Sequence, residues 1–258
     1  MKPKALVFFD LDGTLLNDRS EVEPEVKQAL AQMKEKGAVP FIATGRSPVE
    51  IHEIAEEAGI SSFVSLNGQF VQYEGKEASR NRLPEQSIKK LKETADKEGI
   101  PTSFYSASDF YVTKMSETVV NAYKFIDEEP PDVDPDFYQK EEILMALVIT
   151  EDNRKDALFI EQFPEFSFYR NTPYSMDVIT KGHSKATGID ELVRKMDLEG
   201  VPLYAFGDGS NDIEMFNHAD VAIAMENGIE EVKQAADYIT ASNLDGGIIQ
   251  GLKQYDLI

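Results

Sequence analysis

Cysteine is absent from this sequence of 258 residues, which excludes a disulfide framework, a thiolate zinc site and a cysteine nucleophile. A long apolar segment near the start is also lacking. Met1-Lys2-Pro3-Lys4 leads into the apolar run of residues 5–9, which is too short for the apolar region of a signal peptide or for a membrane span. We therefore expect a cytoplasmic protein that has no membrane partner.

Positive charge is scarce: 26 Lys and Arg residues stand against 47 Asp and Glu residues, which gives a formal net charge of −21. A surface of this charge repels nucleic acid and anionic membranes, so we expect no nucleic-acid partner. It also repels a phosphorylated substrate at long range. Any anion site must therefore be a local concentration of cations, helix N-termini or metal. No feature of the sequence indicates an obligate protein partner.

The rest of the chain is organised around two carboxylates at the end of the first apolar run. Residues 5–9 have the length and composition of a strand buried on both faces, and the run stops at Asp10. Buried charges are rare unless they are paired or bound to metal, so we expect Asp10 at the strand's carboxyl end, where open α/β sheets hold their ligands. Asp12 can turn back toward Asp10, and two close carboxylates repel unless a cation such as Mg²⁺ lies between them. The plainer alternative is that both residues only end a strand and open a turn.

Strands and helices alternate in both outer parts of the chain. Predicted strands cover residues 39–43, 63–66, 202–206, 221–224 and 238–240. Predicted helices cover residues 23–36, 184–196, 213–218 and 229–235. Another helix is predicted from the capping-box pattern Ser47-Pro48-Val49-Glu50 up to Gly59. This alternation predicts an α/β fold with a doubly wound, mainly parallel, Rossmann-like sheet.

The middle of the chain has a different character. From Leu83 to about Lys181, charged helices such as residues 85–97 alternate with strand candidates that carry aromatic residues. These strands are less uniformly apolar, which suits an antiparallel sheet with one solvated face. The predicted domains are therefore a core formed by residues 1–82 and 182–258, and an inserted α+β domain formed by residues 83–181.

Polar residues follow the second and third predicted strands. Thr44-Gly45-Arg46 offers a hydroxyl, a bare backbone and a cation that can hold phosphate oxygens where the next helix begins. The alternative is an ordinary turn, with Arg46 paired to one of the many carboxylates. Asn67-Gly68 also has two interpretations: it forms a hairpin turn, or it lines a site at the strand end.

Lys185 stands at the start of the predicted helix 184–196, where a cation opposes the helix dipole. A nearby negative charge would explain so unfavourable a position. Lys181 is the rival candidate and ranks second, and His183 is interpreted as a loop histidine. Residues 206–212, Phe-Gly-Asp-Gly-Ser-Asn-Asp, again join an apolar strand to a helix, with two carboxylates flanking a Gly-rich turn. Turn chemistry alone is the alternative for that segment.

Asp-Leu-Asp-Gly-Thr-Leu-Leu at residues 10–16 resembles the first motif of the haloacid dehalogenase superfamily of phosphoryl-transfer enzymes. The segments around Thr44, Lys185 and Asp208 match the second, third and fourth motifs in order. The insert resembles the cap of the Cof-type hydrolases in that superfamily, so residues 83–181 are expected to form an α+β cap domain. The resemblance covers essentially the whole chain, and it implies that Asp10 is the nucleophile and Asp12 the general acid/base.

The resemblance also implies roles for the other site residues. Thr44 binds the transferring phosphate, and Lys185 neutralises the nucleophile and the phosphate. Asp208 binds the metal directly, whereas Asp212 acts through water or orients its loop. The implied catalytic residues are Asp10, Asp12, Thr44 and Lys185. The implied substrate-binding residues are Thr44, Gly45, Arg46, Asn67, Gly68, Lys185 and Asn211. The implied metal-binding residues are Asp10, Asp12 (through its backbone carbonyl), Asp208 and Asp212.

We therefore expect a Mg²⁺-dependent phosphatase that hydrolyses small phosphorylated metabolites, with sugar phosphates as the first class, through an aspartyl phosphate. Two alternatives remain. One is a phosphotransferase or mutase on the same scaffold, and the other is a phospho-accepting signalling or binding module. Asp12 and the cap-sized insert argue against the signalling module, since a domain that only accepts a phosphoryl group, and loses it slowly, needs neither a second carboxylate nor a cap.

Overall fold

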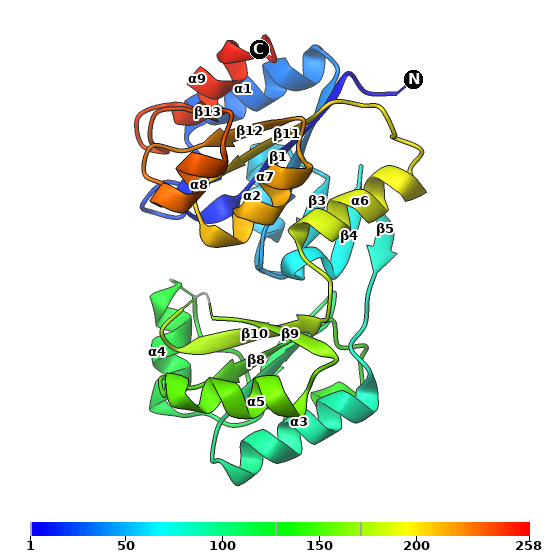
Figure 1. The fold of residues 1–258 in the computed structure, drawn as a ribbon, viewed down its shortest axis with the longest axis vertical. Coiled ribbons are helices and arrows are strands. Elements are labelled where there is room, and N and C mark those ends of the chain that lie inside the picture. Colours follow the sequence, from blue (N-terminus) through cyan, green and yellow to red (C-terminus); the bar gives the residue numbers. More distant parts are fainter. Residues whose placement is uncertain (1, 127, 171) are drawn as a thin grey trace. The chain divides into compact units, whose positions relative to one another are not determined.

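The computed structural model describes residues 2–126, 128–170 and 172–258, and the chain divides into two compact units (Figure 1). The first unit comprises Met1–Arg46, Glu50–Ser79 and Ser184–Ile258. The second comprises Ser47–Val49 and Arg80–His183. Among the described residues, no helix combines the length and the hydrophobicity that crossing a membrane requires.

The first unit is built on an eight-stranded sheet of order β13-β12-β11-β1-β2-β3-β4-β5. The pairs from β13 to β3 are parallel, and β4 pairs with β3 antiparallel. The strands are β1 (Ala5–Phe9), β2 (Ala38–Ala43), β3 (Phe63–Ser65), β4 (Phe70–Tyr73), β5 (Lys76–Arg80), β11 (Leu203–Gly207), β12 (Val221–Ala224) and β13 (Tyr238–Ile239). The predicted fold class, α/β with a mainly parallel sheet, is confirmed.

Strand β1 lies in the middle of this sheet and is buried along its whole length, as its apolar sequence predicts. Its side chains alternate between the two faces of the sheet. On one face Phe8 stacks on Phe41 of β2, with ring centroids 4.5 Å apart. On the other face Phe9 stacks on Phe206 of β11 at 4.9 Å. The central strands are therefore fixed from both sides.

Helices cover both faces of the sheet. Helices α6 (Lys185–Lys195), α7 (Ile213–His218) and α8 (Glu230–Ala235) contribute to one apolar cluster together with Phe8 and Phe41. Helix α9 (Gly247–Gln254) lies on the Phe206 face, where Gly251 packs closely against that ring, and α9 contacts α1 (Pro24–Glu35). Helix α2 (His52–Ala58) contacts α1 in turn. Two covered faces are what a doubly wound fold requires.

The strand register brings the ends of three neighbouring strands together. Phe9, the last residue of β1, is aligned with Ile42 on β2 and with Phe206 on β11. Because these strands are parallel, their carboxyl ends lie at the same edge of the sheet. Open α/β sheets bind their ligands at this edge.

The second unit is an α+β unit with a five-stranded sheet of order β7-β6-β8-β10-β9, in which all four pairs are antiparallel. The strands are β6 (Thr102–Tyr105), β7 (Phe110–Val112), β8 (Met145–Ile149), β9 (Phe166–Tyr169) and β10 (Ser175–Thr180). Helices α3 (Glu85–Lys97) and α5 (Asp156–Gln162) pack on one face through a shared apolar cluster. Part of the other face is covered by α4 (Glu117–Phe125), whose Tyr123 hydroxyl bonds Ser103 and Tyr105 of β6. That face is therefore less exposed than the strand pattern predicts.

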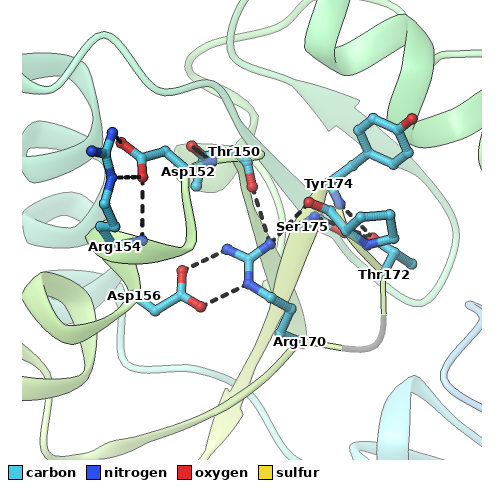
Figure 2. Close-up of polar contacts among 9 residues, drawn as sticks. Thr150, Asp152, Arg154, Asp156, Arg170, Thr172, Tyr174 and Ser175 are labelled. Carbon is cyan, nitrogen blue, oxygen red and sulfur yellow. Dashed lines mark hydrogen bonds and ion pairs between the residues drawn. The ribbon is translucent and has the colours of Figure 1, made fainter.

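Arg170 joins four segments of the second unit (Figure 2). Its guanidinium donates to both carboxylate oxygens of Asp156, at 2.7 and 2.5 Å. It also donates to the backbone carbonyl oxygens of Thr150 and Pro173, at 3.0 and 3.3 Å. Thr150 follows β8, Asp156 begins α5, Pro173 precedes β10 and Arg170 itself directly follows β9, so this one side chain links the ends of four elements.

Candidate active site

A buried lysine links two carboxylates at the carboxyl edge of the first unit's sheet. The Lys185 ammonium donates to Asp10 Oδ1 at 2.5 Å and to Asp212 Oδ1 at 2.8 Å. Only 2% of Lys185 is exposed, and Asp10 and Asp212 are also buried. Asp10 directly follows β1, and its backbone N–H donates to Phe206 of β11. The predicted need for a negative charge near Lys185 is met by these two side chains.

Asp208 completes a group of three carboxylates. Asp10, Asp208 and Asp212 each have an oxygen within 4.8 Å of an oxygen of the other two. Thr14 donates its hydroxyl to Asp208 Oδ1 at 2.8 Å. Gly13, with a φ of +80°, leaves room for this approach, because a Cβ there would lie 2.4 Å from Asp208 Oδ2. The glycine therefore serves both the turn and the contact.

Burial and mutual repulsion shape the protonation of this group. Burial raises the pKa of Asp10 well above its usual value, and the charge of Asp212 adds to this, although Lys185 opposes both. Burial also raises the pKa of Asp208 to about 6, against the effect of the Thr14 hydrogen bond. Burial alone would lower the pKa of Lys185, but the charges of Asp10 and Asp212 raise it above its ordinary value. Lys185 therefore stays charged, whereas the raised pKa values of Asp10 and Asp208 mean that a further positive charge beside these two carboxylates, from a proton or a cation, is favoured.

The donor set suits a divalent cation. Three carboxylates and one ammonium leave two negative charges in excess when all four groups are ionised, and the carboxylate oxygens are close enough to share an ion. Hard cations such as Mg²⁺ prefer oxygen ligands. The residues present therefore fit the predicted metal.

Asp212 also shapes the loop that carries Asp208. Its Oδ2 accepts hydrogen bonds from the backbone N–H groups of Asp208 and Gly209, at 3.1 and 3.0 Å. A Cβ at Gly207 would lie 2.6 Å from the Asp212 carboxyl carbon, so only glycine fits at the end of β11. Asn211, in the same loop, is exposed. Both carboxylate oxygens of Asp212 thus have protein donors.

The loop after β2 is held against the loop after β3. Thr44 is buried, and its hydroxyl accepts a hydrogen bond from the Arg46 backbone N–H at 3.1 Å. The Asn67 backbone N–H donates to the Thr44 carbonyl oxygen, and Asn67 has a left-handed backbone with φ 53° and ψ 40°. A Cβ at Gly45 would come within 3.3 Å of the Asn67 side-chain amide. Thr44, Gly45 and Asn67 therefore form one packed group.

Asn67-Gly68 lies in the hairpin that joins β3 to β4, as one of its two interpretations predicts. This hairpin also packs against the start of α6. A Cβ at Gly68 would lie 2.1 Å from the Ser184 carbonyl oxygen, and one at Gly188 would lie 2.9 Å from the Gly68 Cα. Gly68 thus borders the helical turn that begins with Lys185.

Asp12 is separate from the buried carboxylates. Its side chain is 60% exposed and forms a two-pronged ion pair with Arg46, whose Nε and Nη2 donate to the two oxygens at 3.1 and 2.7 Å. Arg46 therefore pairs with a carboxylate, as the second interpretation of Thr44-Gly45-Arg46 predicted.

Lys181, the rival of Lys185, and the loop histidine His183 belong to the second unit, and the Lys181 side chain is exposed.

Two asparagines that the sequence did not single out support the first loop. Asn227 donates to the Gly13 carbonyl oxygen at 2.7 Å. Asn243 donates its backbone N–H to Asn227 Oδ1 at 3.1 Å and its side-chain amide to the Leu16 carbonyl oxygen at 2.8 Å. The only sequence signal was the position of Asn227-Gly228 soon after β12, at the same edge of the sheet.

The profile of the haloacid dehalogenase-like hydrolase family matches residues 7–252. The chain belongs to this family. The resemblance predicted from the motifs is confirmed, and so is the prediction that the protein is an enzyme.

Relatives of this hydrolase support the predicted enzyme class. YkrA of Bacillus subtilis (strain 168), whose name as a phosphatase is provisional, is 34% identical over 254 residues that cover 98% of each chain. A crystal structure of an uncharacterised protein from Geobacillus kaustophilus HTA426 is 36% identical, with a TM-score of 0.92 over 99% of this chain and 100% of that one. The sugar phosphatase BT4131, of subclass IIB of the superfamily, is 30% identical, with a TM-score of 0.84 over 98% of this chain and 100% of the other.

Replacing Gly68 by Ala tests the contact that supports the start of α6. The new Cβ would meet the Ser184 backbone in addition to the strain of a left-handed alanine, which costs about 1–2 kcal/mol. Gly75→Ala is the matched control, because Gly75 has a similar φ of +76° but, among the residues that the structure describes, only its chain neighbours have heavy atoms within 4 Å of a new Cβ. Urea unfolding should show that Gly68→Ala loses about 1–3 kcal/mol more than Gly75→Ala. Equal losses would mean that the hairpin does not support the helix.

Proposed function

We propose that this hydrolase is a Mg²⁺-dependent phosphatase that cleaves small phosphorylated metabolites through an aspartyl phosphate on Asp10. The observation that carries the proposal is the buried Lys185, which holds Asp10 in place beside two further carboxylates. A carboxylate that is fixed by a cation at the carboxyl edge of an α/β sheet is suited to nucleophilic attack.

In the first half-reaction, a carboxylate oxygen of Asp10 attacks phosphorus. The new O–P bond forms as the ester O–P bond breaks, and Asp12 gives its proton to the leaving alkoxide. In the second half-reaction, Asp12 takes a proton from water, whose oxygen attacks the phosphorus of the aspartyl phosphate. Inorganic phosphate leaves and the Asp10 carboxylate is restored. The exposed Asp12 side chain can reach solvent, as a residue that exchanges protons with water must.

Charge compensation is the main requirement of this chemistry, because a phosphomonoester dianion must approach an anion. In our proposal Lys185 supplies one positive charge, and Thr44, Gly45 and Asn211 orient the phosphate oxygens. Mg²⁺ held by Asp10, Asp208 and the backbone carbonyl of Asp12 would offset the remaining charge when bound. Asp212 is assigned to support, because its oxygens accept hydrogen bonds from Lys185 and from two backbone N–H groups.

Sugar phosphates are the proposed substrate class. The support is the likeness to BT4131, which is described as a sugar phosphatase and aligns with nearly the whole of this chain. A net charge of −21 gives no long-range attraction for phosphorylated metabolites, so recognition has to come from contacts within the site.

Phosphate release from a panel of phosphorylated metabolites tests the proposal. Activity should require Mg²⁺, disappear with a chelator and return when Mg²⁺ is added. Asp208→Ala should lower kcat/KM by roughly 10²-fold or more, since the metal contributes several kcal/mol of charge stabilisation. Asp18→Ala, which changes an exposed aspartate of the same unit, is the control and should leave the rate unchanged.

Full activity after exhaustive chelation would remove Mg²⁺ from the proposal. Adding an acceptor sugar or alcohol to the same assay distinguishes hydrolysis from transfer, because a phosphotransferase or mutase would yield a new ester in place of inorganic phosphate. A protein that is phosphorylated once without turnover would be a signalling module.

We also propose that residues 83–181 form a cap domain, inserted between core segments 1–82 and 182–258, that selects the substrate. The second unit has a sheet and an apolar cluster of its own, and the proposed catalytic residues all lie in the first unit. Specificity requires contacts to the part of the ester that does not react. Replacing residues 83–181 by a short linker should therefore preserve some hydrolysis of a small aryl phosphate and sharply lower kcat/KM for the preferred metabolite. Unchanged relative rates across the panel in a folded variant would contradict this role.

A further inference from the structure

The exposed position of Asp12 does not by itself fix the orientation of its carboxylate. Its side chain is 60% exposed and lies in a turn whose backbone is non-helical at Asp12 and left-handed at Gly13. An exposed aspartate can occupy several staggered rotamers. A group that transfers a proton must instead lie within hydrogen-bond reach of the reacting oxygen. Some partner therefore has to fix the Asp12 carboxylate.

Arg46 has the geometry of such a partner. Its Nε donates to Asp12 Oδ2 at 3.1 Å and its Nη2 donates to Oδ1 at 2.7 Å. Two parallel hydrogen bonds from a planar guanidinium fix both the position and the plane of a carboxylate. Only 10% of the Arg46 side chain is exposed, so its own freedom is small.

The backbone of Arg46 is also anchored. Its N–H donates to the Thr44 hydroxyl at 3.1 Å, and its carbonyl oxygen accepts a hydrogen bond from the Leu66 N–H at 3.0 Å. Thr44 follows β2 and Leu66 follows β3, so the guanidinium extends from a loop that is fixed to two strands of the sheet. The support for Asp12 is thus continuous with the rigid part of the unit.

We propose that Arg46 is a positioning residue that holds the Asp12 carboxylate for proton transfer, and that it does not act as a ligand of the phosphoryl group. This inference rests on the proposed function, in which Asp12 protonates the leaving group. Two of the three guanidinium nitrogens already donate to Asp12. Arg46 therefore contributes to catalysis through Asp12, which differs from the substrate-binding role that its place after the second strand suggested.

A residue that positions Asp12 and a residue that binds the phosphoryl group should affect kcat/KM differently as the leaving group changes. An alkyl phosphate needs a proton from Asp12 as its alkoxide departs, whereas p-nitrophenolate leaves without one. The ratio kcat/KM covers the reaction from free enzyme through the departure of the leaving group. Losing the support of Asp12 should lower kcat/KM for alkyl esters and spare it for p-nitrophenyl phosphate. Losing a phosphate ligand would lower both.

The experiment measures kcat/KM of the full-length Mg²⁺-loaded enzyme for a hexose 6-phosphate and for p-nitrophenyl phosphate. Arg46→Met should lower the first value by about 10–100-fold, a part of the 10²–10⁴-fold that general acid catalysis contributes. The second value and the inhibition constant of inorganic phosphate should change by less than about threefold. Arg46→Lys should restore part of the loss, because an ammonium still donates but lacks the fork. Arg19→Met, at an exposed arginine that pairs with Glu21, is the control and should match the wild type.

A double-mutant cycle with Asp12→Asn completes the test. If Arg46 acts through Asp12, adding Arg46→Met to Asp12→Asn should cost less than about twofold more for the hexose phosphate. Equal losses for both esters with weaker inhibition by phosphate, or fully additive losses in the cycle, would overturn the proposal. If Arg46→Met does not fold, Arg46→Lys is compared in the same cycle. A wild-type enzyme that releases phosphate from p-nitrophenyl phosphate and from every member of the metabolite panel at no measurable rate would instead overturn the proposed function.

Discussion

The buried ion pair of Lys185 with Asp10 and Asp212 is the interaction on which the site depends. Transferring an ammonium and two carboxylates out of water is costly, and only mutual attraction with satisfied hydrogen bonds offsets that cost. The Lys185 ammonium bonds both carboxylates, and Asp212 accepts two backbone N–H groups with its other oxygen. Removing the lysine would leave two buried carboxylates without their cation, so its loss should destabilise the fold as well as the proposed chemistry.

Close backbone packing makes this ion pair possible. Lys185 begins α6, and the Asn67-Gly68 hairpin leaves so little space beside Ser184 that neither Gly68 nor Gly188 has room for a side chain. At the other side of the pair, Gly207 makes room for Asp212 and Gly13 for Asp208. The helix, the hairpin and the strand ends can thus approach one another closely because a glycine lies at each close contact. As a result, the Lys185 ammonium and the three carboxylates lie together in a protein whose net charge of −21 repels anions.

Much of this arrangement could be predicted from local patterns. The apolar run before Asp10 predicted a buried strand with a carboxylate at its end, and the position of Lys185 at a helix start predicted a nearby negative charge. Contacts between distant loops could not be predicted in this way. Thr14 donates a hydrogen bond to Asp208, 194 positions away in the sequence, and Asn227 donates one to Gly13, 214 positions away. Threonine and asparagine form such bonds with many partners, so the residue type alone does not predict which one. For Arg46 a carboxylate partner was foreseen, but only the fold shows that it is Asp12.

Local patterns also misled in places. Ser47-Pro48-Val49-Glu50 predicts a helix start, but α2 begins at His52, because residues 48–51 form a turn and the buried Ser47 is not its N-cap. Helices were expected in the middle of the chain, but the positions of α4 and α5 were not predicted, since short helices in a charged, aromatic segment owe their stability to packing on the sheet of the second unit.

The measurement that tests the central claim most directly is mass spectrometry of the enzyme, quenched in acid during turnover of a phosphate ester with Mg²⁺. The account predicts a phosphoryl group on Asp10 that disappears in Asp10→Asn. A phosphoryl group on a serine, threonine or histidine, or turnover that persists in Asp10→Asn, would contradict it.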